Sequence, residues 1–229
     1  KEESIFDLHG IEIEIERALK RKIWLKSGGY IVIDEAEALT AIDVNTGRYV
    51  GKKSLEETIL KTNIEAAKEI AYQLRLRNIG GIIIVDFIDM EKEENRRKVY
   101  TTFQEALSGD KARINIFQIS ELGLIEMTRK RVRKSLSSSL CYPCPYCEGD
   151  GYIKSPTTIC YEIFHEIRKK PSMPLDKRVM VEVHPAIADL LYDEERQSID
   201  ALEKEIQKKI YIKADPNLHQ EQYEVRFSP

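Results

Sequence analysis

The chain has 229 residues, of which 42% are hydrophobic and 33% charged, and a formal net charge of −3. This length can bury one large core or two small ones, and the composition excludes a disordered or fibrous chain. No apolar run approaches the roughly 18 residues of a membrane-spanning helix, and the N-terminal stretch lacks the apolar core of a signal peptide. We therefore expect a cytoplasmic protein, in which clustered cysteines stay reduced and serve as metal ligands.

Strand and helix patterns are mixed in the first part of the chain. The predicted elements are a hairpin over 23–35, a strand over 36–47, a helix over 54–81, a strand over 82–89, a helix over 92–107, and strands over 112–120 and 124–132. Ser54 and Glu57 have the spacing of a capping box at the start of the first helix. The run 82–89 is almost wholly apolar, as expected for a strand covered on both faces. We therefore predict one mixed sheet with helices, up to about residue 139.

A smaller unit follows. Its predicted elements are a helix over 157–170, a linker "PSMP" at 171–174, a strand over 178–183, helices over 185–191 and 194–209, and strands over 210–215 and 222–227. These elements predict a small α+β unit. The first residue is Lys1 rather than methionine, so we expect a fragment or a processed product.

Basic residues gather in four short clusters. Residues 129–134, "RKRVRK", hold five basic side chains in six positions, and smaller clusters lie at 20–22, 51–53 and 75–77. A single cluster of this kind is most often only a solvated face. Together with carboxylates at strand ends, the clusters also fit attraction of a polyanion.

Three apolar runs end in an aspartate, at Asp34, Asp43 and Asp86. The two-residue period of a strand places Asp43 and Asn45 on one face. Mg²⁺ is commonly held by one or two carboxylates, so Asp43 and Asp86 fit a magnesium site if their strands are neighbours. Asp34 and Asp89 are equally eligible on spacing alone, and an isolated aspartate more often only ends a strand.

Three of the four cysteines lie within seven residues, in "CYPCPYC". Cys144 and Cys147 have the spacing of zinc ligands and precede the glycines of a tight knuckle. Zinc takes four ligands, so Cys141 and His165 are candidates for the remainder, or a second copy of the chain donates its own pair. A redox pair or free structural thiols are the alternatives, and Cys160 fits an ordinary core position.

These stretches together resemble the ribonuclease E/ribonuclease G family of bacterial endoribonucleases. The matching stretches are "GGYIVIDEAEALTAIDVN", "TNIEAAKEIAYQLRLRNIGGIIIVDFIDM", "ISELGLIEMTRKRVRKSL" and "CPYCEGDG". They cover most of residues 24–155, and the C-terminal "IYIKADPNLHQEQYEV" is more similar to the ribonuclease G members.

The resemblance assigns roles to individual positions. It implies that Asp43 and Asp86 bind catalytic Mg²⁺ and that Asn45 is an active-site residue. It further implies that Cys144 and Cys147 form half of a Zn²⁺ site shared between two protomers of a homodimer. Cys141 lies outside the family's CPxC motif, so its role stays open as a possible further ligand.

The resemblance also implies a domain organisation. Residues 1–18 would be the tail of a ribonuclease-H-like subdomain, and residues 19–140 a deoxyribonuclease-I-like catalytic subdomain. Residues 141–155 would be the zinc link, and residues 156–229 the small dimerisation domain. The family's S1 domain and 5′-sensor pocket would lie before Lys1.

The implied activity is Mg²⁺-dependent cleavage of single-stranded RNA to 5′-phosphate and 3′-hydroxyl ends, in rRNA maturation and mRNA decay. The basic stretch would contact RNA phosphates through four side chains, Arg129, Lys130, Arg131 and Arg133. Two other classes stay open: a non-catalytic, zinc-stapled RNA-binding scaffold, and a metal-dependent phosphatase or deoxyribonuclease using the same carboxylates. Assembly beyond a dimer is also open.

Overall fold

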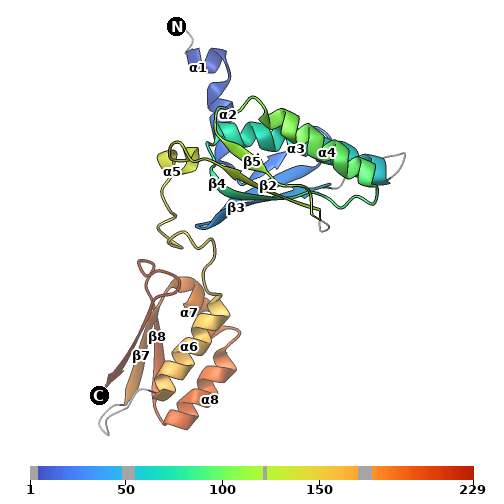
Figure 1. The fold of residues 1–229 in the computed structure, drawn as a ribbon. Helices are drawn as coiled ribbons and strands as arrows, with labels where there is room; N and C mark the ends of the chain where they lie inside the picture. Colours follow the sequence, from blue (N-terminus) through green and yellow to red (C-terminus); the bar gives the residue numbers. More distant parts are fainter. Residues whose placement is uncertain (1–4, 48–54, 121–122, 170–176) are drawn as a thin grey trace. The chain divides into compact units, whose positions relative to one another are not determined.

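The computed structural model describes residues 5–47, 55–120, 123–169 and 177–229 (Figure 1). The chain divides into two compact units, Lys1–Tyr142 and Pro143–Pro229, each with its own apolar core. Within the described ranges, no helix combines the length and apolarity needed to cross a bilayer.

The N-terminal unit is built on a six-stranded mixed sheet. Its strands are β1 (Lys22–Trp24), β2 (Tyr30–Glu35), β3 (Leu39–Asn45), β4 (Gly81–Asp86), β5 (Ile114–Ile116) and β6 (Leu124–Arg129). They lie in the order β1-β2-β3-β4-β6-β5, and only the central β3–β4 pair is parallel. A parallel pair needs a crossover, which the long helix between β3 and β4 provides.

Helices cover one face of this sheet (Figure 1). The unit contains α1 (Ile5–Leu8), α2 (Ile11–Leu19), α3 (Leu55–Leu76), α4 (Glu93–Leu107) and α5 (Leu136–Leu140). Apolar residues of α3 and α4 pack with alternate residues of the central strands, so that Ile42, Ile83 and Val85 are buried. The intervening residues face the opposite side, where Ile82 is 52% exposed. The prediction that β4 is covered on both faces is therefore wrong for the part of the chain described.

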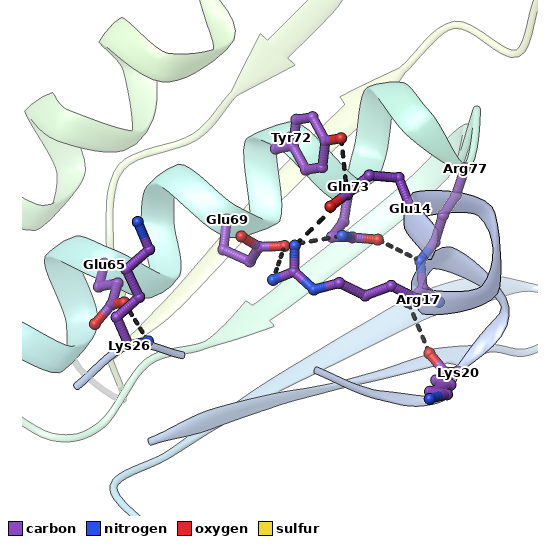
Figure 2. Close-up of polar contacts among 9 residues, drawn as sticks. All are labelled: Glu14, Arg17, Lys20, Lys26, Glu65, Glu69, Tyr72, Gln73 and Arg77. Carbon is purple, nitrogen blue, oxygen red and sulfur yellow. Dashed lines mark hydrogen bonds and ion pairs between the residues drawn. The ribbon is translucent and has the colours of Figure 1, made fainter. Parts of the chain in front are cut away.

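The helix α2 is joined to α3 by a row of polar contacts (Figure 2). Arg17 pairs with Glu69 at 2.8 Å, and Gln73 donates to the same carboxylate at 2.8 Å. The guanidinium of Arg77 donates to the Gln73 side chain at 2.8 Å and to the carbonyl of Lys20 at 2.7 Å. These contacts group α2 with the first unit. Assignment of residues 1–18 to a separate subdomain stays a prediction.

The C-terminal unit has a three-stranded sheet and three helices. Its elements are α6 (Pro156–Lys169), β7 (Arg178–Val183), α7 (Pro185–Tyr192), α8 (Arg196–Ile206), β8 (Lys209–Ala214) and β9 (Tyr223–Ser228). The central strand β7 is parallel to β8 and antiparallel to β9. Apolar residues of the helices pack with β7, whose Val179, Val181 and Val183 are buried. This arrangement confirms a small unit of mixed helices and strands.

The sequence patterns located the main elements closely, with two clear differences. The strand expected over 112–120 is limited to Ile114–Ile116. The strand expected over 124–132 ends at Arg129, and residues 130–134 have no regular structure. The expected cap at Ser54, the basic cluster 51–53 and the linker 171–174 fall, wholly or in part, outside the described residues.

Candidate active site

Two aspartates meet at the end of the parallel strand pair. Asp43 on β3 and Asp86 on β4 are register partners, so their side chains leave the sheet on the same face. Both side chains are exposed on the face that the helices leave open. The structure therefore brings together the two carboxylates that the sequence could link only if their strands were neighbours.

The amide of Asn45 completes this group. Its Nδ2 donates to Asp43 Oδ2 at 2.7 Å, which fixes the orientation of that carboxylate. Asp34, by contrast, is held by Arg21, whose Nη2 donates to Asp34 Oδ2 at 2.6 Å. That contact lowers the pKa of Asp34 below its ordinary value. Asp34 is thus already neutralised by a cation, which separates it from Asp43 and Asp86.

The electrostatics at Asp86 favour a bound cation. Burial raises its pKa above the ordinary value, and the negative charges of Asp43 and Asp89 raise it further. Among the described residues, no lysine or arginine forms an ion pair with Asp43 or Asp86. Like charges held together without a counter-ion disfavour ionisation, and a divalent cation relieves that cost.

An asparagine in α3 holds the segment that follows Asp86. Asn63 is fully buried, and its side chain donates to the carbonyl of Ile88 at 2.8 Å and accepts from the Ile88 N–H at 3.1 Å. This double contact satisfies both backbone groups of Ile88, which lies between Asp86 and Asp89. The only sign of Asn63 in the sequence is a polar residue on the apolar face of a predicted helix, which was not among the predicted site residues.

The hairpin turn before β2 packs against the end of β3. A side chain at Gly29 would place its Cβ 2.7 Å from the carbonyl oxygen of Asn45, so this close approach requires glycine. Glu65 on α3 accepts from the N–H groups of Lys26 and Ser27, at 2.5 and 2.9 Å. The turn that supports Asn45 is therefore itself fixed by the main helix.

The predicted RNA-binding stretch divides into buried and exposed residues. The Arg129 side chain is only 5% exposed and pairs with Asp110 at 2.8 Å. It also donates to the carbonyl of Ile79 at 2.7 Å. Because these contacts use its donors inside the unit, Arg129 is a structural residue rather than a phosphate contact. The other three predicted phosphate contacts, Lys130, Arg131 and Arg133, are exposed, and Arg131 also donates to the carbonyl of Gly80 at 3.1 Å.

The basic cluster at 75–77 is structural as well. Arg77 is 5% exposed within the polar row described above, and Arg75 donates to the carbonyl of Ala106 at 2.8 Å. Burial lowers the pKa of Arg77, although nearby glutamates partly offset that effect. The solvated-face interpretation and the polyanion interpretation both fail for the buried Arg77, whereas Arg75 is an exposed residue that links α3 to α4.

Cys144 and Cys147 form a compact knuckle in the C-terminal unit. The N–H groups of Cys147 and Tyr146, with a further contribution from the Cys147 thiol, lower the pKa of Cys144. The N–H of Gly151 donates to Cys147 Sγ at 3.3 Å. N–H groups aimed at both sulfurs favour thiolates, the form that binds zinc.

The knuckle rests on the loop between β8 and β9. The ring of His219 lies 4.0 Å from that of Tyr146, and His219 Nε2 is 2.7 Å from the Tyr146 carbonyl oxygen. The N–H of Glu221 donates to His219 Nδ1 at 3.1 Å, so Nε2 carries the proton and donates to Tyr146. His219 was not a predicted site residue, because 73 positions separate it from Tyr146 in the sequence.

The other two predicted zinc ligands are Cys141 and His165. Cys141 is exposed at the end of α5, and His165 lies on the surface of α6. Over the described ranges, no three His, Cys, Asp or Glu side chains gather closely enough to hold a metal ion. Cys160 is fully buried, and burial raises its pKa to about 11, which confirms it as a core residue.

Comparisons with known proteins cover both units. Residues 1–132 match the model of the ribonuclease E/G family, and residues 143–227 match the thioredoxin-like domain of RNase E/G. The chain is 48% identical to ribonuclease G of Salmonella typhimurium and of Escherichia coli strain K12, over 96% of its own length and 45% of theirs. It is 42% identical to ribonuclease E of Escherichia coli, over 87% of its length and 19% of that protein. The chain thus spans less than half the length of these curated relatives.

Proposed function

The chain belongs to the ribonuclease E/G family, and we propose that it carries the catalytic carboxylates of an endoribonuclease, a hydrolase that cuts within RNA. One observation carries this proposal: Asp43 and Asp86 are register partners on one sheet face, with Asn45 bonded to Asp43. The match to relatives named ribonuclease G and ribonuclease E supports RNA as the substrate class.

The donor set fits a magnesium ion. Asp43 and Asp86 present hard oxygen ligands and have no ion-paired lysine or arginine among the described residues. Mg²⁺ commonly takes one or two such carboxylates. We propose Asp43 and Asp86 as its ligands. When bound, Mg²⁺ would offset charge on the scissile phosphate and favour ionisation of the attacking water.

The remaining roles belong to side chains of this chain. The side-chain N–H of Asn45 donates to Oδ2 of Asp43 and so fixes that carboxylate. The side-chain oxygen of Asn45 would then orient the phosphate or the attacking water. The exposed residues Lys130, Arg131 and Arg133 would contact phosphates of a single strand without reading its sequence. In-line attack of water at phosphorus, with departure of the 3′ oxygen, would leave 5′-phosphate and 3′-hydroxyl ends.

The cysteine knuckle supports a proposed zinc link over residues 141–155. Each chain offers two sulfurs with N–H groups aimed at them, whereas structural zinc takes four ligands. We propose that two chains share one Zn²⁺ in a homodimer and that residues 156–229 help to form the dimer. We also propose that residues 19–140 are a deoxyribonuclease-I-like subdomain, which the helix-backed mixed sheet supports.

The biological setting is part of the same proposal. We assign the activity to rRNA maturation and mRNA decay in the cytoplasm, where the free thiols of this chain would stay reduced. This assignment rests on the family match rather than on any contact in the fold.

Cleavage of three substrates tests the proposed function. Single-stranded RNA, single-stranded DNA and a phosphomonoester are each incubated with the chain, with Mg²⁺ or with chelator, and the products are separated on gels. The proposal expects RNA alone to be cut, only with Mg²⁺, and Asp43→Asn to abolish the cut. RNA binding without cleavage favours the scaffold, and turnover of DNA or the monoester favours the rival enzymes.

A further inference from the structure

An exposed aromatic pair lies on the same sheet face as the carboxylates. Trp24, the single tryptophan of the chain, is 60% exposed. Its ring packs edge-on against Tyr30 on the next strand, with 5.2 Å between ring centroids and 63° between planes. A tryptophan with this much free ring surface forms little of the core, so its exposed area is available to a ligand.

A lysine adds positive charge to this pair. Lys22 Nζ lies 4.1 Å from the centroid of Trp24 and 3.5 Å from that of Tyr30. In the part of the chain that is described, no carboxylate forms an ion pair with Lys22, whereas its neighbour Arg21 pairs with Asp34. The rings therefore hold an ammonium whose charge is free to attract an anion.

The strand register aligns these residues with the proposed active site. Trp24 is the partner of Tyr30, and Tyr30 is the partner of Asn45. In a second row across the same face, Lys22 is the register partner of Val32, and Val32 is the register partner of Asp43. At about 4.8 Å per strand, Trp24 lies about 10 Å from Asn45 on one continuous face. That spacing suits a nucleotide close to the one whose phosphate reaches the carboxylates.

We propose that the exposed ring of Trp24, held edge-on by Tyr30, is a stacking platform for an unpaired base of the RNA strand, with Lys22 contacting a neighbouring phosphate. This inference rests on the proposed function and adds a determinant of single-strand preference. Aromatic rings beside a cation suit an unpaired base of any identity, since every base has a π face. The bases of a duplex are already stacked on one another, so the platform would select single strands.

Intrinsic tryptophan fluorescence tests the platform without labels, because Trp24 is the single tryptophan of the chain. The chain is titrated with a single-stranded oligoribonucleotide and with the matching duplex, in chelator and at low salt. The proposal expects saturable quenching by the single strand and much less by the duplex. Unchanged emission at RNA concentrations that saturate binding of a labelled strand would overturn it, and so would complete failure to bind.

Variants give an independent measure. Trp24→Ala should weaken binding of a labelled single strand by about 5- to 150-fold, the loss of one stacked base, and Trp24→Phe should restore most of it. Tyr161→Ala is the matched control, since Tyr161 is 58% exposed in a similar edge-on pair with Phe164 in the other unit. Equal affinities for wild type, Trp24→Ala and Tyr161→Ala would overturn the platform.

The proposed function can fail separately. If the single strand quenches Trp24 but is never cut with Mg²⁺, the endoribonuclease assignment fails and the platform stands. If RNA is cut normally by Trp24→Ala and its affinity is unchanged, the platform fails and the assignment stands.

Discussion

The carboxylate pair and the cysteine knuckle differ in how much of each site one chain supplies. Asp43 and Asp86 are placed by a parallel strand pair at the centre of a sheet, and Asn45, Asn63 and the hairpin turn support them. Cys144 and Cys147 lie in a short knuckle that rests on a loop. Backbone N–H groups point at its sulfurs, and the two sulfurs would be half of a tetrahedral zinc set.

Under the proposed function, this difference separates a site that folding of one chain completes from a site that a second chain would complete. Register in a buried sheet is strongly specified, because a slip of one residue would turn Asp43 toward the core. A knuckle with two ligands gains most of its stability when metal binds. The first site should therefore depend on the interior of one unit, and the second on a second chain.

The largest expected effect is on cleavage. Asp43→Asn and Asp86→Asn should each lower the cleavage rate by at least about 100-fold with little change in fold, because an amide is a poorer ligand for Mg²⁺ than a carboxylate. Gel assays of RNA cleavage and thermal unfolding measure the two quantities.

Asp34→Asn is the matched control for this pair. It removes an exposed ion pair with Arg21 at the same sheet, so it should change the rate less than about threefold. A large loss from Asp34→Asn together with a small loss from Asp86→Asn would mean that the catalytic strand ends were misassigned.

The second effect concerns assembly. Cys144→Ser and Cys147→Ser should each release zinc and shift the dimer toward monomer, while the unfolding temperature of the N-terminal unit stays unchanged. Cys141→Ser should leave zinc and assembly as in wild type, because this cysteine lies outside the knuckle. Elemental analysis and sedimentation measure both. Loss of zinc from the Cys141→Ser variant would show that the Cys141 thiol is a zinc ligand.

The third effect tests the interior that supports the carboxylates. Arg129→Met should destabilise the chain by about 3–5 kcal/mol, since it leaves the buried Asp110 without its partner. Arg133→Met, at an exposed position of the same stretch, should cost less than about 0.5 kcal/mol. Urea unfolding gives both values, and equal small losses would contradict the structural role of Arg129.

The same ion pair predicts a pH dependence. Burial alone would raise the pKa of Asp110, but hydrogen bonds from Arg129 and Ala112 hold it below its ordinary 3.8. Its contribution to the free energy of unfolding is therefore present above pH 3.8 and is lost as pH falls through the lowered value. Wild type should lose this increment on acidification, whereas Arg129→Met should not.

The smallest effect concerns the two hydrogen bonds between the Asn63 side chain and the backbone of Ile88. Asn63→Ala should cost about 1–3 kcal/mol of stability, because it leaves backbone groups of Ile88 unsatisfied in a partly buried setting. It should also lower the cleavage rate, since Ile88 lies between Asp86 and Asp89. Asn95→Ala is the control, because Asn95 bonds Glu56 between the first turns of α4 and α3, rather than a backbone group of Ile88. A lower cleavage rate for Asn95→Ala than for Asn63→Ala would contradict a positioning role for Asn63.

The sequence predicted what depends on local pattern and missed what depends on packing. Helix periodicity and strand alternation located α3, α4 and the small unit, because these signals lie within each segment. Spacing alone could not rank the four aspartates, since the choice depends on which strands become neighbours. The burial of Arg129 and Arg77 was likewise hidden, because a basic run looks the same whether its side chains face solvent or Asp110. Contacts between distant segments, such as His219 with Tyr146, leave no local signal.

Native mass spectrometry of the zinc-loaded chain tests the contrast between the two sites most directly. We expect a species of two chains with one Zn²⁺, which separates into metal-free single chains when a chelator removes the zinc. Asp43→Asn should give the same species, because the carboxylates lie in the other unit. A single chain carrying its own Zn²⁺ would contradict the account, since the knuckle would then be complete without a partner.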